Sequence, residues 1–377
     1  MGMTMTQRVP CWIQGKPAAS GSERYTEIRN PATQELIAEV PDGTATDVDQ
    51  AVACAAAAFE DWRSTPISER ARVFLRLQHL VTEHKEDLAR MITDEQGKTL
   101  EDARGDVFRG LEVIEFACGI ANHVMGETVE NVARGVDTYS LVQPLGVCAG
   151  ITPFNFPAMV PLWMWPIAIA AGNTFVLKPS ERVPLTSMRI AELARDAGLP
   201  DGVLNLVHGG RTVVQRLCTH PLVKALSFVG SAVAGRAIYS MATAEGKRCQ
   251  ALMAAKNHAV ILPDADRERA LSGIVGAAFG ASGQRCMAIS VAVFVGESKS
   301  WIPGLVQRAR SMRVGPGVDP KSDLGPLISP DSKRRICDLI AVGVADGADL
   351  LLDGRDCVVE GFETGNFMGP SILSGAP

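Results

Sequence analysis

The chain has 377 residues, of which 46% are hydrophobic and 21% are charged, and its formal net charge is -5. This length accommodates two or three domains with a large core. The acidic balance, without a long basic run, excludes a general nucleic-acid or membrane-surface role. The nine cysteines show neither CxxC nor Cys/His ligand spacing, which argues against a disulfide framework and a zinc site. We therefore expect no metal and a cytoplasmic, reducing location.

The first third of the chain has the periodicity of helices. Apolar residues recur three and four positions apart in residues 47–62, 67–97 and 101–124. The next segment, 137–151, alternates in the manner of a strand.

From residue 144 to 262, short β-rich runs alternate with helical runs. The β-rich runs are 146–151, 173–179, 203–209, 224–230 and 258–264, and the helical runs are 183–198, 211–220 and 231–246. This alternation predicts parallel βαβ units and an α/β fold with a doubly wound open parallel sheet. Ligands of such sheets bind beyond the carboxyl ends of the strands, so chemistry is expected there.

Three strand ends carry polar residues. Asn155 in "ITPFNFP" is either a turn residue or an amide donor for an oxyanion. Lys178 and Glu181 in "LKPSE" could bracket the diol of a ribose, although the GxGxxG fingerprint is absent. Ser231 in "FVGSAVAG" is a natural N-cap, and the helix that follows either holds a phosphate or is an ordinary capped turn.

Cys286 lies in "GASGQRCMAIS", a loop of small residues in which Arg285 comes directly before it. A free cysteine is most often an inert buried side chain. Cys286 differs from the other eight because its loop follows a nucleotide-binding pattern. The sequence therefore makes this thiol a candidate nucleophile.

The motifs "TPFNFP", "LKPSE", "FVGSAVAG" and "GQRCMA", in this order and at these separations, resemble the aldehyde dehydrogenase superfamily. The segments "AKNHAVILPDAD" and "GQRCMAIS" are similar to the CoA-acylating methylmalonate-semialdehyde dehydrogenase branch. The resemblance extends from about residue 10 to the end of the chain.

This resemblance implies specific roles. Cys286 is expected to add to the aldehyde carbon, while Asn155 and the Cys286 backbone N–H form the oxyanion hole. NAD is expected to accept the hydride. The residues that match NAD-contacting positions are Thr152, Phe154, Lys178, Glu181, Arg182, Ser231 and, through its backbone carbonyl, Met253. Glu181 would repel a 2′-phosphate, which favours NAD over NADP.

One departure from the superfamily concerns the general base. Most members carry a glutamate four residues before the lysine that corresponds to Lys256, and this chain has Leu252 there. Leucine cannot activate water, whereas the thiol of coenzyme A needs less activation. A carboxylated substrate would be held by Arg109 and Arg285.

The expected reaction is therefore the NAD-dependent, CoA-acylating oxidation of methylmalonate or malonate semialdehyde. Its products would be propionyl-CoA or acetyl-CoA, with loss of CO2. Two alternatives stay open, a hydrolytic aldehyde dehydrogenase that releases a free acid and a truncated, non-catalytic NAD-binding protein.

The resemblance also implies a domain order. Residues 1–128 and 147–254 would form the NAD-binding domain, 129–146 a strand segment for oligomerisation, and 255–377 a second α/β domain that is catalytic. Family members continue beyond the position of residue 377, so we expect the catalytic domain to be incomplete. In its full-length form the protein is expected to be a homotetramer, built as a dimer of dimers.

Overall fold

The computed structural model describes residues 7–375, and these residues form two compact units. The first unit contains the described residues up to Ile28 together with Ala38–Leu88 and Gly105–Met253. The second unit contains Arg29–Ile37, Ala89–Arg104 and the described residues from Ala254 onward. The predicted cofactor-binding residues therefore all belong to the first unit, and Cys286 belongs to the second.

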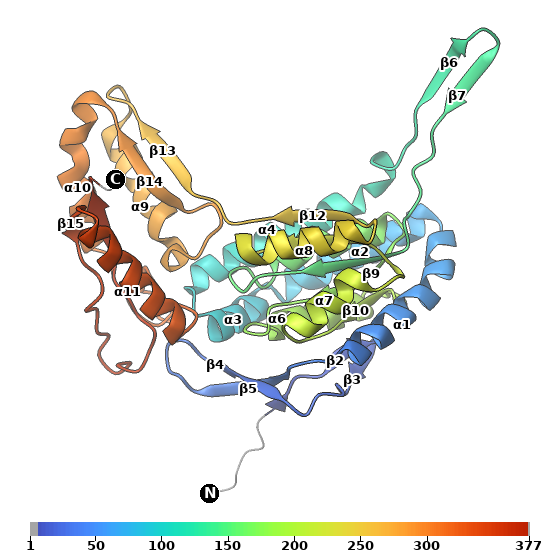
Figure 1. Cartoon of the computed structure of the whole chain (residues 1–377), viewed down its shortest axis with the longest axis horizontal. Helices are drawn as coiled ribbons and strands as arrows, with labels where there is room; N and C mark the ends of the chain where they lie inside the picture. Colours follow the sequence, from blue (N-terminus) through green and yellow to red (C-terminus); the bar gives the residue numbers. More distant parts are fainter. Residues whose placement is uncertain (1–6, 376–377) are drawn as a thin grey trace, which may run out of the picture. The chain divides into compact units, whose positions relative to one another are not determined.

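A seven-stranded sheet forms the centre of the first unit (Figure 1). Its strands lie in the order β12 (Arg248–Leu252), β11 (Val223–Val229), β8 (Val147–Ile151), β9 (Thr174–Lys178), β10 (Leu204–Leu206), β2 (Cys11–Ile13) and β3 (Lys16–Ala18). Neighbours from β12 to β10 are parallel, and β2 and β3 add an antiparallel edge. The chain moves outward from β8 to β10 and then returns to β11 beside β8. Such a reversal of strand order is where open α/β sheets bind ligands.

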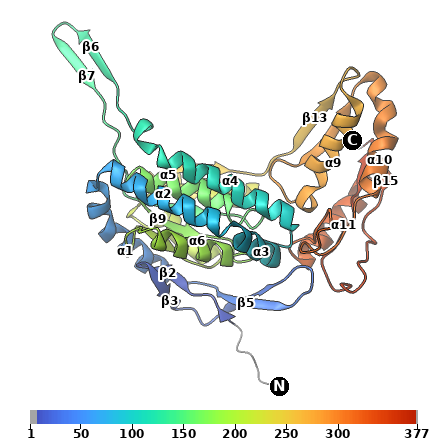
Figure 2. The same cartoon turned by 180° about the vertical axis from the view of Figure 1, so that it is seen from behind.

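Helices cover both faces of this sheet (Figures 1 and 2). On one face α1 contacts β8, β9 and α7, and α8 packs on β11 and β12. On the other face α5 contacts β8 and β9, and α2 packs against α5 and α6. These helices are α1 (Ala45–Ser64), α2 (Ile67–Glu83), α5 (Met159–Ala170), α6 (Leu185–Asp196), α7 (Arg211–Thr219) and α8 (Ala232–Ala244). The predicted doubly wound α/β fold is confirmed.

The central strands are buried on both faces. Every residue of β8 and β9 is buried, as is expected for parallel strands between two helical layers. Val48 and Val52 of α1 belong to the core cluster on one face. On the other face, a Cβ added to Gly150 would come within 2.9 Å of Phe175 and Met164, so a glycine in β8 allows α5 to approach closely.

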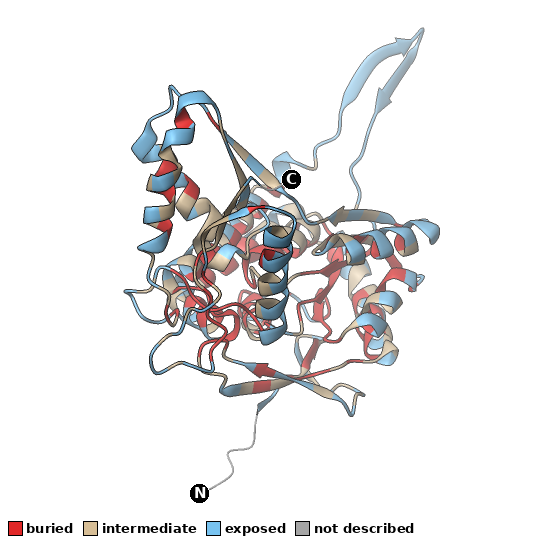
Figure 3. Ribbon diagram, turned by 60° about the vertical axis from the view of Figure 1, so that its left-hand side comes forward, coloured by how far each residue is buried: buried red, intermediate tan, exposed pale blue. Residues whose placement is uncertain are grey.

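The remaining elements before residue 140 are a small sheet, a hairpin and three helices. The small sheet has the order β1 (Gln7–Arg8), β5 (Leu36–Pro41) and β4 (Tyr25–Arg29). The hairpin of β6 (Thr128–Ala133) and β7 (Val136–Tyr139) is exposed along its length (Figure 3). The helices are α3 (Lys85–Gln96), α4 (Leu100–Cys118) and the short 3-10 helix η1 (Ile120–Asn122). The predicted helical run 67–97 is divided into α2 and α3, because His84 leaves helical geometry (φ -94°, ψ 13°).

The second unit contains two small sheets and their helices. The parallel pair β13 (Asn257–Ile261) and β14 (Ile289–Phe294) packs against α9 (Arg267–Phe279) and α10 (Ile302–Arg310). The antiparallel pair β15 (Asp349–Leu352) and β16 (Ile372–Ser374) packs against α11 (Pro330–Ala345). Two 3-10 helices, η2 (Gly280–Gly283) and η3 (Gly296–Trp301), flank β14.

The structure corrects the sequence prediction for one strand. The run 258–264 was expected in the doubly wound sheet, but β13 pairs with β14 in a different sheet. The edge position next to β11 is taken instead by β12, which the sequence did not indicate. As an edge strand, β12 alternates exposed and half-buried residues, so it lacks the continuous apolar run of a central strand. Within residues 7–375, no helix has both the length and the apolar character that a bilayer span requires.

Candidate active site

The segment after β8 carries the first group of predicted site residues. Thr152 donates its backbone N–H to the carbonyl oxygen of Lys178 at 3.1 Å. The side chain of Thr152 is buried, and its Oγ1 has no hydrogen-bond partner among the described residues. Phe154 and Asn155 follow in a half-buried loop. A buried hydroxyl without a partner is unusual, and it points to a group that the protein chain itself does not supply.

The loop that contains Asn155 ends at the first turn of α5. The helix has Ala158 at its N-cap, which makes no capping hydrogen bond. The missing capping bond is supplied by Asp106 of α4, which is fully buried. Its Oδ1 accepts the N–H of Met159, the first residue of the helix, at 2.7 Å. A carboxylate at a helix N-terminus satisfies an amide and interacts favourably with the helix dipole. Asp106 therefore fixes the end of the Asn155 loop.

Lys178 and Glu181 form an ion pair directly after β9. The Lys178 ammonium lies 2.9 Å from Glu181 Oε2, and the lysine side chain is almost fully buried. Burial alone would raise the pKa of the Glu181 carboxyl. The charge and hydrogen bond of Lys178, with a smaller contribution from Arg182, instead hold that pKa below its ordinary value. Arg182 is exposed. The pair thus presents a carboxylate that stays ionised.

The turn after β11 leads into α8 through Ser231. The Ser231 Oγ accepts the N–H of Ala234 at 3.3 Å, so this serine is the N-cap that the sequence predicted. Met253, just after β12, packs over Gly235, because a Cβ added there would lie 2.7 Å from the Met253 side chain. The N-terminus of a 13-residue helix is therefore held close to the ends of β11 and β12.

Strand register brings these positions to one edge of the sheet. Ile151 lies opposite both Lys178 and Phe228, and Val229 lies opposite Leu252. The carboxyl ends of β8, β9, β11 and β12 therefore lie side by side, with the reversal of strand order between β8 and β11. The predicted cofactor-binding residues follow these four ends.

In the second unit, Cys286 lies in the loop between η2 and β14. All nine cysteines lie among the described residues, and Cys286 alone is exposed. Burial raises the pKa of the thiols of Cys11, Cys148 and Cys218 to about 11. At neutral pH these three are protonated and poor nucleophiles. Exposure therefore distinguishes Cys286 from the other eight cysteines.

Hydrogen bonds to other segments of the second unit anchor the loop around Cys286. The Asn257 amide donates to the carbonyl oxygens of Cys286 at 2.8 Å and Ala288 at 3.0 Å. Gln284 Oε1 accepts the N–H of Ile328 at 3.1 Å. The loop is therefore anchored before the cysteine through the Gln284 side chain, and at and after the cysteine through backbone carbonyl groups.

The two arginines expected to bind substrate have different surroundings. Arg285 pairs with Asp102, and it also donates to the carbonyl oxygen of Gly276 at 3.3 Å. Arg109, on α4 in the first unit, is exposed and lies 2.9 Å from Glu112 Oε2. Because a guanidinium has five N–H donors, these contacts leave donors for a further acceptor on each side chain.

Leu252, which the sequence comparison of motifs places at the position of the general base, lies at the end of an edge strand. Leu252 is the last residue of β12, and 47% of its surface is exposed. Residues 251–255 are Ala, Leu, Met, Ala and Ala, none of which can accept a proton from water.

Comparison with known proteins identifies the family of this chain. The profile of the aldehyde dehydrogenase family matches residues 18–377. The chain belongs to the aldehyde dehydrogenase family. Both the family and the branch that the motifs predicted are confirmed.

Similar proteins carry the names of acylating aldehyde dehydrogenases. A Dictyostelium discoideum protein assigned as a methylmalonate-semialdehyde/malonate-semialdehyde dehydrogenase [acylating], mitochondrial, is 57% identical over 364 residues, which cover 96% of this chain and 69% of that protein. The Arabidopsis thaliana methylmalonate-semialdehyde dehydrogenase [acylating], mitochondrial, is 56% identical over 98% of this chain and 61% of its own length. This aldehyde dehydrogenase chain thus spans about two thirds of these relatives.

Solved structures with a very similar fold are also known. A crystal structure from Sinorhizobium meliloti, of a protein assigned as a methylmalonate-semialdehyde dehydrogenase and complexed with NAD, superimposes with a TM-score of 0.96. It is 45% identical and covers 98% of this chain, which in turn covers 76% of that chain. The methylmalonate-semialdehyde dehydrogenase from Oceanimonas doudoroffii gives a TM-score of 0.95 at 44% identity, with the same two coverages.

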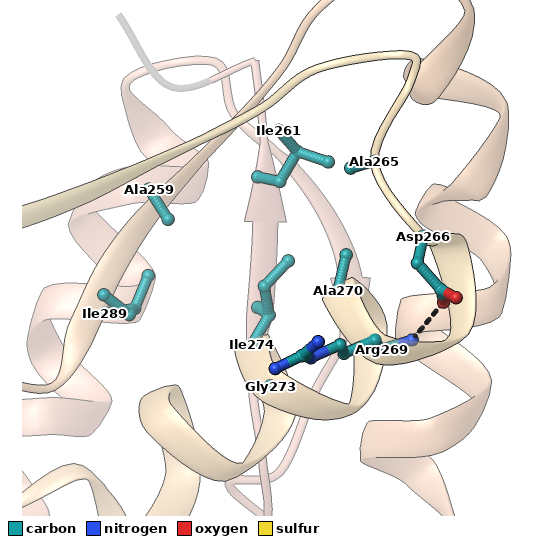
Figure 4. A pocket seen from close by; sticks show the side chains of 9 residues that line it. All are labelled: Ala259, Ile261, Ala265, Asp266, Arg269, Ala270, Gly273, Ile274 and Ile289. Atoms are coloured by element: carbon teal, nitrogen blue, oxygen red, sulfur yellow. Dashed lines mark hydrogen bonds between the residues drawn. The ribbon is translucent and has the colours of Figure 1, made fainter.

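One hollow of this aldehyde dehydrogenase chain lies apart from the predicted site residues (Figure 4). It has a volume of about 450 Å³ in the second unit, between β13, β14 and α9. Its lining is mostly apolar, and Asp266 accepts the N–H of Arg269 at its margin. None of its lining residues is a predicted site residue, so we assign it no role in the chemistry.

Three residues near the predicted site were not found by sequence reasoning. Asp102, Asp106 and Asn257 each bind backbone groups in or next to a loop that carries a predicted catalytic residue. Their partners are 179, 53 and 29 positions away in the chain. No local motif of the sequence indicates such contacts.

Proposed function

We propose that this chain performs the NAD-dependent, CoA-acylating oxidation of methylmalonate or malonate semialdehyde. The products are propionyl-CoA or acetyl-CoA and CO2. The observation that carries the proposal is Leu252, which stands where a water-activating glutamate would be expected, in a chain 57% identical to a relative named as acylating.

The residues that follow the carboxyl ends of β8, β9, β11 and β12 have the chemistry that NAD requires. Thr152 offers a buried hydroxyl that has no partner within residues 7–375. The N-terminus of α8 offers amides and a positive dipole end for a phosphate. Glu181, kept ionised by Lys178, can accept hydrogen bonds from a ribose diol and would repel a 2′-phosphate. These residues fit NAD, with Phe154, Arg182 and the Met253 carbonyl as its further contacts.

Cys286 is the proposed nucleophile. Its thiolate adds to the aldehyde carbon, and Asn155 together with the Cys286 backbone N–H donates hydrogen bonds to the resulting oxyanion. Bound NAD supplies the hydride acceptor. Loss of hydride from the thiohemiacetal carbon leaves an acyl thioester on Cys286. In a malonyl-type thioester the carboxylate lies β to the carbonyl, so loss of CO2 leaves an enolate, which a proton then quenches.

The acceptor of the acyl group follows from Leu252. Without a carboxylate there, water attack on the thioester is slow, and transfer from Cys286 to the thiol of coenzyme A is favoured. A hydrolytic enzyme would need another base near the thioester.

Arg109 and Arg285 are the proposed ligands of the substrate carboxylate. Arg109→Leu should lower kcat/KM for malonate semialdehyde, because losing a charge-assisted hydrogen bond costs about 1.5–3 kcal/mol, or roughly tenfold and more. Propanal, which has no carboxylate, should be affected little. Equal losses with both aldehydes would assign Arg109 a structural role.

An assay of NADH formation with and without coenzyme A tests the proposal. Steady turnover that depends on coenzyme A supports the acylating reaction. Steady turnover to a free acid without coenzyme A would favour the hydrolytic alternative. NAD binding without turnover of any aldehyde would favour a non-catalytic NAD-binding protein.

We also propose that the hairpin of β6 and β7 mediates self-association into a tetramer. Its exposed side chains include Val129, Val132, Val136 and Tyr139. Apolar side chains on a fully exposed hairpin are typical of an interface.

The unpaired cysteines fit a reducing compartment, and we propose the cytoplasm as the location of the protein.

A further inference from the structure

The backbone that leads into Cys286 has an unusual conformation. Ala281 (φ 50°, ψ 36°) and Ser282 (φ 55°, ψ 35°) are both left-handed, and Gly283 (φ 71°) continues the turn. A left-handed residue other than glycine costs about 1–2 kcal/mol. Two such residues in succession persist only if contacts from elsewhere hold them.

One carboxylate binds both ends of this turn. Asp102 Oδ2 accepts the N–H of Ala281 at 2.9 Å, and Asp102 Oδ1 accepts a hydrogen bond from the Arg285 guanidinium. Asp102 lies on α4, 183 positions before Arg285, yet both belong to the second unit. The segment 281–285 is therefore closed by a single side chain directly before Cys286.

The surroundings make this contact stronger than a surface ion pair. The side chains of Asp102 and Arg285 are only 19% and 28% exposed, so solvent screens their charges incompletely. The guanidinium lies over Gly280, where an added Cβ would collide with it, and it also donates to the carbonyl oxygen of Gly276. Its orientation is thus set by Asp102, Gly276 and the absence of a side chain at Gly280.

We propose that Asp102 is a positioning residue for the nucleophile. Both of its oxygens are engaged, so its role is to hold the turn that places Cys286, and to orient Arg285, rather than to transfer a proton. The inference rests on the proposed role of Cys286. It adds a determinant of rate on a helix that is remote in sequence from the cysteine.

Removing this contact should loosen the turn without unfolding the chain. Ser282 donates to the carbonyl oxygen of Gly325 at 2.5 Å, and Asn257 and Gln284 make the contacts described above. These bonds do not involve Asp102.

The test compares Asp102→Ala and Asp102→Asn with Glu101→Ala. Glu101 is the neighbouring carboxylate on α4, 89% exposed and paired at 3.7 Å with Arg104 of the same helix. Hydrogen exchange of residues 280–288 reports the turn. Acylation of Cys286 by p-nitrophenyl acetate, followed by release of nitrophenolate, reports the placement of the thiol and requires neither NAD nor an aldehyde.

In Asp102→Ala, exchange at the Ala281 amide should rise about tenfold or more. The maximal acylation rate should fall about tenfold, while KM for the ester and Kd for NAD stay within about twofold. Asp102→Asn keeps an acceptor for Ala281 but loses the charge, so it should be intermediate. Glu101→Ala should match the unmodified chain.

Unchanged exchange in Asp102→Ala, or faster exchange with an unchanged acylation rate, would overturn the proposal. So would a loss of NAD affinity that equals the loss of acylation rate, because this would indicate a general effect on folding. A chain that is acylated at Cys286 but makes no NADH would refute the proposed dehydrogenase function and leave the test of Asp102 intact.

Discussion

Replacing Asp106 with alanine tests how the Asn155 loop is held. The change removes the acceptor of a 2.7 Å hydrogen bond from Met159 and leaves a buried N–H without that partner. A hydrogen bond to a charged group contributes about 1.5–3 kcal/mol. A carboxylate at a helix N-terminus adds about 0.3–1 kcal/mol. Asp106→Ala should therefore lower the free energy of unfolding by about 2–4 kcal/mol.

Urea unfolding followed by tryptophan fluorescence measures this loss, since Trp165 lies in α5 itself. Asp106→Asn retains a side-chain oxygen for Met159 and should lose about half as much. Glu115→Ala, an exposed carboxylate on the same helix, should change stability by less than about 0.5 kcal/mol. The reasoning is refuted if Asp106→Ala is as stable as the unmodified chain, or if asparagine is no better than alanine.

The other predictions concern the chemistry and the cofactor. Cys286→Ser should abolish NADH formation and leave NAD affinity nearly unchanged, since a serine hydroxyl is a far weaker nucleophile at neutral pH; retained turnover would contradict the assignment. Glu181 has a lowered pKa, so its ionised form stabilises the fold above the ordinary carboxyl value of 4.5, and this contribution is lost as pH falls through the lower folded value. Lys178→Met should reduce that dependence in acid-unfolding curves, and identical curves would show that the pair does not matter. Without coenzyme A, enzyme mixed with NAD and semialdehyde should give a burst of NADH close to one per Cys286 and then a slow phase, which Leu252→Glu should accelerate. A linear time course without coenzyme A would contradict this expectation. Ala281→Gly should change the stability measured by thermal unfolding by less than about 1 kcal/mol, because relief of the left-handed strain offsets the lost burial of the methyl group and the entropy cost of glycine; a loss of more than about 2 kcal/mol would show that the turn is not strained.

The central strands could be predicted because they are buried on both faces. β8 and β9 read as continuous apolar runs, and their flanking helices have clear periodicity. β12 could not be predicted in this way, because only Cys249 and Ala251 pack on the core while their neighbours face solvent. The prediction that β13 belongs to the doubly wound sheet was wrong, because strand pairing depends on contacts that a strand's own residues do not specify.

The candidate site was predictable where it follows strand ends. The carboxyl ends of parallel strands meet at one edge, so Thr152, Lys178 and Ser231 could be grouped from sequence alone. Asp102 and Asp106 could not be found, since nothing in the sequence of α4 separates them from the exposed carboxylates of the same helix. Only their hydrogen bonds to distant backbone groups distinguish them from Glu101 and Glu115.

The placement of Leu252 on an edge strand has an evolutionary consequence. In the described part of the chain β12 pairs with one strand, β11, and nearly half of the Leu252 surface faces solvent. A substitution there disturbs little of the core, so few stabilising mutations are needed to accommodate it. Under the role proposed for Leu252, the choice between water and a thiol as acyl acceptor can therefore change by one or two substitutions while the sheet and the Cys286 loop stay intact. An aldehyde dehydrogenase scaffold of this kind can exchange one product class for another without first passing through an unstable intermediate sequence.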